Sequence, residues 1–387
     1  MLYTENPRPL TARYGEYDIV IAGGGIAGIA AALAAAREGR RVLLIERMFG
    51  LGGLATLGLV TIYLPLDDGM GTQVSFGIAE ELLKLSILHG AEAEYPDTWL
   101  EGKKEHGQQR YRVRYNANVF AVLAEELLTK AGVEILYGTT LCSVLRTGSR
   151  VDALVVENKD GRSAIPAKAF VDATGDADIF HMADAPTALY GAGNNLGAWF
   201  YETQGSDLKL HLLNMSDESP DNGRISGLDA KEITDTQLRS HSFSLRTFLK
   251  SGGVSDGHSL SMLTAIPQLR MTRRLAGAYT LDESEDHATF PDSVGMICDW
   301  RKRGPVFEIP LRTLYTPELV NVAAAGRCIS VTDPMWDISR VIPPCAVTGQ
   351  AAGLALALSD DLTKLDVSEL QQKLRASGVK LHLSELE

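Results

Sequence analysis

The stretch IVIAGGGIAGIAAALAAA, from Ile19 to Ala36, carries no charge and places three consecutive glycines before a run of small and apolar residues. By composition it fits a membrane segment, a buried helix or a phosphate-binding loop. The apolar run before the glycines is typical of a buried parallel strand, and the alanine-rich run after them is typical of a helix. A glycine cluster stands where a spanning helix would begin, and four charged residues follow the stretch within five positions, so we expect no membrane span.

The spacing of the glycines predicts a dinucleotide site. In Gly23-x-Gly25-x-x-Gly28, the first glycine permits a tight turn, the second lets the backbone approach a pyrophosphate, and the third lets helix and strand pack closely. A second buried strand, RRVLLIE, ends at Glu46, whose carboxylate can accept both hydroxyls of an adenosine ribose. NAD and FAD share this fingerprint, so the stretch alone does not distinguish them.

Composition and charge narrow the class of protein. The 387 residues have a formal net charge of -12, which argues against nucleic acid or an anionic membrane as a main partner. The four cysteines are far apart and form no CxxC pair, so we expect neither a disulfide framework nor a metal site. The first residues lack the apolar segment of a signal peptide, and we expect a cytoplasmic protein.

The strand and helix patterns of an α/β fold occur in three separated parts of the chain. We therefore predict a doubly wound, Rossmann-like FAD-binding domain built from residues 16–64, 112–184 and 305–358. The more polar residues 65–111 and 185–304 are predicted to form an inserted α+β substrate domain, and residues 359–387 a C-terminal helical segment. Within the first insert, the polar residues 90–111 are expected to be exposed.

Segments beyond the first glycine motif favour FAD. The chain resembles the FAD-dependent oxidoreductases, two-domain flavoproteins of the glutathione-reductase-like superfamily, and within them a bacterial group mostly without an assigned substrate. The segments that carry the resemblance are GGGIAG, LGGLAT, FVDATGDAD, DWRKRGPVFEIP, AGRCIS and RVIPPCAVTGQAAG. The DWRKRGP stretch points to the narrower group.

The resemblance implies a role for each matching segment. The pyrophosphate would be held by Gly23, Gly24, Gly25, Ile26, Ala27 and Gly28. The adenosine half would be met by Glu46, Arg47, Leu141, Ala173, Thr174, Gly175 and Asp176. The flavin half would be met by Gly52, Gly53, Leu54, Ala55, Thr56, Gly326, Arg327, Arg340, Val341 and Ile342. A positive helix end near the last of these would stabilise a reduced, anionic flavin.

Missing residues exclude some chemistries of the related flavoproteins. No cysteine precedes Cys142, so the redox cysteine pair of the disulfide reductases is absent. No histidine precedes His89, so we expect non-covalent FAD at the second glycine pair. A second GxGxxG motif is also missing, so no NAD(P)H-binding domain is evident.

Catalytic residues have no clear signature. Three residues are candidates. Tyr63 follows the loop expected to approach the flavin, and Arg273 forms a basic cluster with Arg270 and Arg274. Asp299 lies at a predicted domain junction, a usual place for a substrate cleft. We expect dehydrogenation of a small polar substrate, sugar-like or a hydroxy acid, by hydride transfer to flavin N5, with an unknown electron acceptor. Two alternatives stay open: an NAD-binding enzyme resembling the thiazole-forming enzymes, and a non-enzymatic flavin electron-relay subunit.

Overall fold

The computed structural model describes residues 9–89, 110–195, 197–214 and 224–386. The stretch 90–111, expected to be exposed, lies outside the described residues except for its last two. The described chain forms a seven-stranded sheet with helices packed on it, a smaller three-stranded sheet, and several short strand pairs.

The main sheet has a parallel half that begins at the glycine motif. Its strands run in the order β5-β2-β1-β8, with β16 also paired to β8. These strands are β1 (Tyr17–Ala22), β2 (Val42–Ile45), β5 (Glu134–Leu136), β8 (Gly161–Asp172) and β16 (Val322–Ala324). β1 and β2 are apolar and almost wholly buried, as expected for parallel strands covered on both faces. The predicted doubly wound α/β sheet is confirmed.

Strand β8 belongs to two sheet regions at once. Its second half pairs in parallel with β1, while its first half pairs antiparallel with β7 (Arg150–Asn158). β7 in turn pairs antiparallel with β6 (Thr140–Thr147), so an antiparallel hairpin extends the parallel sheet.

Two helices with glycines and alanines at their contact cover one face of the sheet side by side. They are α1 (Ile26–Arg37), which begins at the glycine motif, and α8 (Ile342–Leu358). A Cβ added at Gly349 would lie 2.3 Å from the Ala27 carbonyl oxygen, and one at Gly353 would lie 2.2 Å from that of Ala31. Only glycine permits the two backbones to approach so closely.

Other helices surround this pair. They are α2 (Ile78–Ile87), α4 (Ala117–Lys130), α5 (Asp178–Met182), α7 (Asp333–Ser339) and α9 (Val367–Ala376). The short strand pairs are β3 (Ile62–Tyr63) with β4 (Val113–Arg114), β9 (Thr187–Leu189) with β13 (Arg273–Leu275), and β14 (Ser293–Cys298) with β15 (Val306–Pro310).

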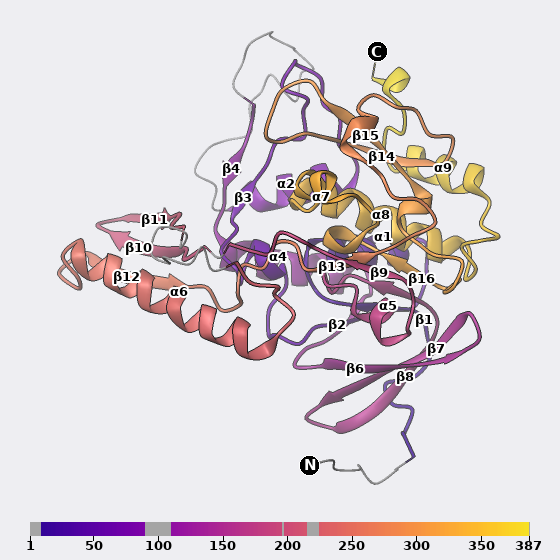
Figure 1. The fold of residues 1–387 in the computed structure, drawn as a ribbon, viewed down its shortest axis with the longest axis horizontal. Coiled ribbons are helices and arrows are strands. Elements are labelled where there is room, and N and C mark those ends of the chain that lie inside the picture. Colours follow the sequence, from indigo (N-terminus) through magenta and orange to yellow (C-terminus); the bar gives the residue numbers. More distant parts are fainter. Residues whose placement is uncertain (1–8, 90–109, 196, 215–223, 387) are drawn as a thin grey trace.

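The smaller sheet lies to one side of the molecule (Figure 1). It contains β10 (Phe200–Gln204), β11 (Asp207–His211) and β12 (His258–Leu263), in the order β11-β10-β12, with α6 (Ala230–Lys250) beside it. Two small apolar clusters belong to this region, while Leu275 to Ile297 contribute to the main core. The predicted domain boundaries remain a prediction, and these clusters favour an insert that ends near residue 270.

No single helix among the described residues is both long and apolar enough to span a membrane. Only when α7 and α8 are counted together, across a bend of 91° between them, do they reach the length and apolar composition of a span.

Candidate active site

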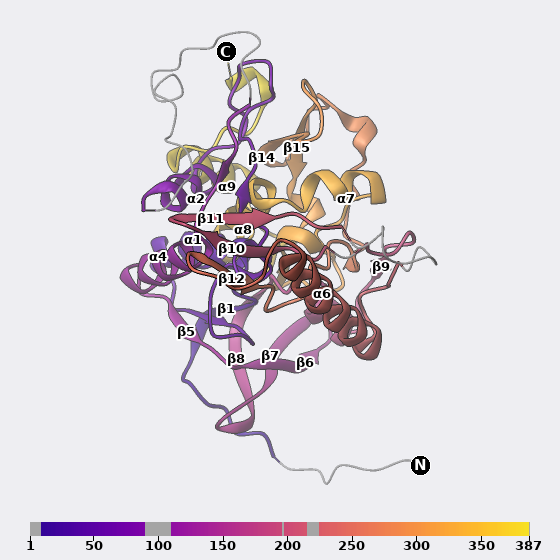
Figure 2. The ribbon, with the colours of Figure 1, turned by 90° about the vertical axis from the view of Figure 1, so that its left-hand side faces the viewer.

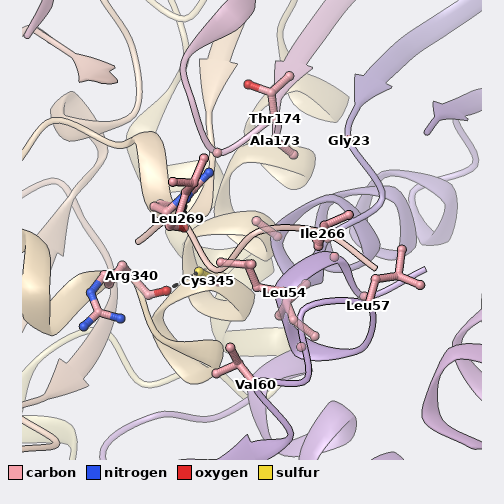
Figure 3. Close-up of a pocket in the computed structure, with 18 of the residues that line it drawn as sticks. Gly23, Leu54, Leu57, Val60, Ala173, Thr174, Ile266, Leu269, Arg340 and Cys345 are labelled. Atoms are coloured by element: carbon pink, nitrogen blue, oxygen red, sulfur yellow. Dashed lines mark hydrogen bonds between the residues drawn. The ribbon is translucent and has the colours of Figure 1, made fainter. Parts of the chain in front are cut away.

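A cavity of about 510 Å³ lies between the glycine motif and the segment that follows β12. This volume is in the range of small-molecule and cofactor sites. Nearly all of the predicted cofactor residues line it; Gly24, Gly28, Thr56 and Gly326 do not. Figure 3 shows Gly23, Ala173 and Thr174 toward one end and Arg340 and Cys345 toward the other, with apolar side chains around them.

The three motif glycines have three different surroundings. Gly23 has a φ of +105°, and a Cβ there would lie 2.4 Å from the carbonyl oxygen of Ala173. A Cβ at Gly28 would lie 1.9 Å from the carbonyl oxygen of Gly23. A Cβ at Gly25 would meet no atom within 4 Å, and Gly25 lines the cavity. Gly23 and Gly28 are therefore required for packing, whereas Gly25 leaves space for a ligand next to the backbone.

Glu46 lies at the end of β2 and is fixed by backbone amides. Its Oε2 accepts a hydrogen bond of 2.7 Å from Gly24 N, and its Oε1 accepts one of 2.8 Å from Met48 N. These amides orient the carboxylate, each oxygen of which has a further lone pair available for a ligand. Glu46 is largely buried but lines the cavity, a position suited to accepting hydroxyl groups.

The second glycine pair is joined directly to the first motif. Gly52 N donates to the Gly24 carbonyl at 2.8 Å, and Gly52 forms a bridge with Gly25. Gly52 and Gly53 both have positive φ, a conformation that favours glycine. The LGGLAT segment therefore continues the cavity wall that begins at the first glycines.

An acidic turn follows β8 and is held by two arginines. Asp176 Oδ1 lies 2.7 Å from Arg327 Nη2, and Asp178 Oδ1 lies 2.6 Å from Arg273 Nη2. Arg273 Nε also donates to the Asp176 carbonyl at 2.8 Å. Burial and the neighbouring Asp176 raise the pKa of Asp178. Two ion pairs and a hydrogen bond to the backbone therefore hold this turn at the cavity.

The N-terminus of α8 forms the other end of the cavity. Val341 is its N-cap residue, without a side-chain cap, and Val341 and Ile342 line the cavity. Prolines at 343 and 344 lack an N–H, so Ile342 has the first free amide of the helix. Burial raises the pKa of Cys345 to about 12, and its thiol donates to the Arg340 carbonyl at 3.4 Å.

Several residues that line this end have no counterpart among the predicted cofactor residues. The tryptophans Trp199 and Trp300 and the segment Ile266–Pro267 come from outside the predicted cofactor segments. The Ile266–Pro267 segment reaches the cavity because Ala265 N donates to the Leu57 carbonyl at 2.8 Å and the Gln268 side chain donates to the Gly58 carbonyl at 2.6 Å. Such long-range pairing leaves no local signal in the sequence.

Arg270 also lines the cavity, and it differs from the other two arginines of its predicted cluster. Arg274 Nη2 lies 3.4 Å from Asp333 Oδ1, and Arg273 is paired with Asp178. No carboxylate of the described chain lies within ion-pairing distance of Arg270, whose guanidinium carbon lies 5.4 Å from the ring centroid of Trp199. Burial, with Arg340 nearby, lowers the pKa of Arg270 to about 10, so it remains a cation at neutral pH.

None of the three catalytic candidates lines the cavity. Tyr63 is buried, and its hydroxyl donates to the Ala79 carbonyl at 2.5 Å. Asp299 is fully buried, and its Oδ2 lies 3.0 Å from Arg301 Nη2. Arg273 supports the acidic turn from behind. The structure does not bring these three candidates to the cavity, because each side chain is engaged in internal contacts.

The cavity residues and the segments that carry them match one family model over almost the whole chain. The model described as FAD dependent oxidoreductase matches residues 18–198 and 189–374. The chain belongs to the FAD-dependent oxidoreductase family. It is therefore an oxidoreductase enzyme, and its cofactor is FAD, which decides against the NAD-binding and non-enzymatic alternatives.

More distant similarities agree with this assignment. The tRNA uridine 5-carboxymethylaminomethyl modification enzyme MnmG of Thermus thermophilus is 32% identical over 162 residues, 41% of this chain and 25% of that protein. The L-aspartate oxidase of Mycobacterium tuberculosis is 29% identical over 210 residues, 47% of this chain and 40% of that protein. The chain thus matches less than half the length of either relative.

One solved structure supports the fold. The p-nitrophenol 4-monooxygenase PnpA of Pseudomonas putida superposes with a TM-score of 0.52 at 14% identity, covering 92% of this chain and 83% of that one. The likeness is one of fold alone.

The residues present are suited to FAD. The backbone at Gly25 is open to the cavity, the first-turn amides of α1 have no side-chain cap, and Glu46 can accept from a ribose. An unpaired helix N-terminus next to an open glycine backbone is a suitable place for a diphosphate. The second helix N-terminus, at α8, faces the opposite end of the same cavity.

Proposed function

We propose that this enzyme dehydrogenates a small substrate that carries a carboxylate, such as a hydroxy acid. The observation that carries the proposal is Arg270, a largely buried cation on the cavity wall with no carboxylate partner among the described residues. A buried charge without a partner is costly, and an anionic ligand would supply one. A planar guanidinium can bind a carboxylate through two parallel hydrogen bonds.

A second arginine of the cavity supports the choice of Arg270. Arg340 lies near it, but its Nε lies 3.1 Å from Asp337 Oδ1, so that its charge is already balanced. Asp337 is also close to Arg301, with 3.3 Å between the carboxylate Oδ2 and Nη1. Of these two neighbouring arginines, Arg270 is therefore the one with no carboxylate within ion-pairing distance among the described residues, which suits a substrate with a carboxylate better than a neutral sugar.

The FAD is proposed to bind without a covalent link, along the residues predicted from the sequence. Its diphosphate would meet the α1 N-terminus and Gly25, its adenosine ribose Glu46, and its flavin half the segment from Gly52 to Thr56 and the α8 N-terminus. When bound, FAD supplies the acceptor for a hydride, at flavin N5.

The chain's own residues would orient the substrate and exclude water. Arg270 would hold the carboxylate, and Trp199, Trp300 and Leu54 would provide apolar walls around the reacting carbon. Cys345 remains a thiol at neutral pH, since burial raises its pKa to about 12, and so it does not act as a base there. A dry, oriented site favours transfer by proximity and by excluding side reactions.

The relatives give limited support for an acidic substrate. L-aspartate oxidase, by its name, acts on a molecule that carries carboxylates, and it aligns with this chain over 210 residues. Because that alignment covers 40% of the relative, it supports the class of substrate only.

The proposal is tested by anaerobic bleaching of the bound FAD. Hydroxy acids should bleach the flavin absorbance, while the matching alcohols without a carboxylate and simple sugars should not. Arg270→Met should raise the dissociation constant for the reactive acid by roughly tenfold to a hundredfold, the usual worth of a charge-assisted hydrogen bond, and Arg270→Lys should recover part of it. Arg150→Met, at an exposed ion pair with Asp360, is the matched control.

Two outcomes would contradict the proposal. One is bleaching by sugars or alcohols that is as fast as bleaching by acids. The other is an Arg270→Met enzyme that binds the reactive acid as tightly as the wild type does.

A further inference from the structure

The long helix α6 has its three leucines on the side that faces away from the protein, while Phe248 is buried and Ile233 and Phe243 pack inward. Its buried positions are Thr236, Ser240, Ser244 and Phe248, spaced four residues apart. Leu238, Leu245 and Leu249 lie on the opposite face with 60%, 45% and 56% of their surface exposed. A surface helix of a globular protein ordinarily shows the reverse pattern, with its leucines toward the core.

The inward face of α6 is adapted to polar contact. Ser240 Oγ donates to the Gly197 carbonyl and Ser244 Oγ to the Ala198 carbonyl, both at 3.2 Å. These small side chains let the helix lie close to the backbone that leads into β10. The helix is therefore held in place without its leucines, which are left for contacts outside the chain.

The apolar face continues into the turn after the helix. Val254, in that turn, has 78% of its surface exposed, and Leu249, near the end of the helix, has 56%. Figure 1 shows α6 and this turn at the outer edge of the molecule, and Figure 2 shows the helix from that side with no described element over it. An exposed apolar group of this kind usually marks an interaction site.

The charges around these leucines are positive. Arg239, Arg246 and Lys250 are exposed beside them, while the exposed acidic residues Asp235 and Asp256 lie just outside the two ends of this segment. The whole chain has a net charge of -12, so this basic patch is local. Because salt screens charges beyond about 10 Å, the patch and not the distant acidic surface decides what docks here.

We propose that the second half of α6 and the following turn bind the surface of an anionic lipid bilayer. Exposed leucines with flanking arginine and lysine are the features of a helix that lies in a membrane interface without crossing it. The projecting position of the turn lets Leu249 and Val254 enter a flat surface first. The proposal does not depend on the substrate.

A second copy of this chain fits the patch less well. In an antiparallel helix pair centred between His241 and Ser242, Leu238 would meet Leu245 of the second copy. Arg239 and Arg246 lie on one flank of the leucines, and a twofold pair places that flank against itself. The like charges would oppose the pairing, whereas an anionic surface would attract them.

The test is co-sedimentation of the FAD-loaded enzyme with vesicles. Binding is expected to vesicles of phosphatidylcholine mixed with phosphatidylglycerol, to weaken as salt is added, and to be absent with phosphatidylcholine alone. Leu245→Ser with Leu249→Ser should abolish sedimentation. Arg239→Glu with Lys250→Glu should weaken it at least tenfold, since each basic residue contributes about fivefold at an anionic surface.

A matched control distinguishes binding through α6 from non-specific binding of exposed apolar residues to vesicles. Leu189→Ser removes a leucine that is 63% exposed on β9, away from α6, and should leave vesicle binding unchanged. Retained flavin absorbance and circular dichroism show that each variant is folded. No binding of the wild type to anionic vesicles overturns the proposal. So does a concentration-dependent dimer in solution, or capture of an acidic protein, that the same leucine variants abolish.

Discussion

Gly25 and Gly28 stand three residues apart on one loop, yet a methyl group has opposite consequences at the two positions. At Gly25 it would project into the open cavity, and at Gly28 it would collide with the Gly23 backbone. We expect Gly25→Ala to weaken FAD binding by more than tenfold while changing the free energy of unfolding of the apoprotein by less than about 1 kcal/mol. Flavin fluorescence titration and urea unfolding of the apoprotein measure the two effects.

Gly28→Ala is the matched comparison for that experiment. Its Cβ would lie 1.9 Å from a carbonyl oxygen, so the helix must shift, and the apoprotein should lose about 2 kcal/mol or more of stability. Equal effects of the two substitutions on apoprotein stability would contradict the assigned roles.

Asp172, at the end of β8, should give the protein a distinct pH dependence. Burial, together with the neighbouring Asp178, raises its pKa from 3.8 to about 7. Because the folded pKa lies above the unfolded value, the folded protein binds the extra proton between about pH 4 and 7. The contribution of Asp172 to stability therefore falls as the pH rises through that range.

The measurement is urea unfolding of the wild type and Asp172→Asn at several pH values. The free energy of unfolding of the wild type relative to the variant should fall by more than about 1 kcal/mol from pH 4 to 7. Exposed Asp256→Asn serves as the control. A relative stability that stays flat or rises with pH would refute the prediction.

At the scale of elements, the contact between α1 and α8 links packing to cofactor binding. Gly349 and Gly353 bring α8 against the α1 backbone, and both helices begin at the cavity. Gly353→Ala should push the helices apart, lowering stability by about 2 kcal/mol or more and weakening FAD binding as well. Thermal unfolding and flavin titration measure both, with Gly191→Ala as the control, since a Cβ there meets nothing closer than 4.0 Å.

Elements with a strong local pattern could be read from the sequence. The glycine motif, α1, β2 and the acid at Glu46 follow from residues within one short segment, and the structure has them as expected. Tyr63 does not reach the cavity, because β3 pairs with β4, a partner far along the chain, and the Tyr63 hydroxyl bonds to α2. Arg270 was placed in a basic cluster but not in the cavity, because its position depends on hydrogen bonds from its segment to residues 57 and 58.

At the scale of the whole molecule, the cavity is closed by segments that are distant in the sequence. The glycine loop forms one wall and residues 266–270 contribute another. FAD should therefore slow amide hydrogen exchange in both segments together and raise the unfolding temperature. Free FAD at a hundred times its dissociation constant should add about 2.7 kcal/mol to the free energy of unfolding. Exchange in the hairpin of β14 and β15 provides the internal reference. Protection confined to the glycine loop would show that the second wall does not respond to the cofactor.

Strand β8 has a consequence for how the chain acquires its structure during synthesis. β1 leaves the ribosome early but finds its partner β8 only after about 150 further residues, and β16 joins β8 after about 150 more. Contacts between such distant segments fold slowly, and until β8 arrives one edge of an apolar strand remains open. We therefore expect nascent chains that end before residue 172 to be held by chaperones or to aggregate, whereas chains that continue past β16 can close the sheet.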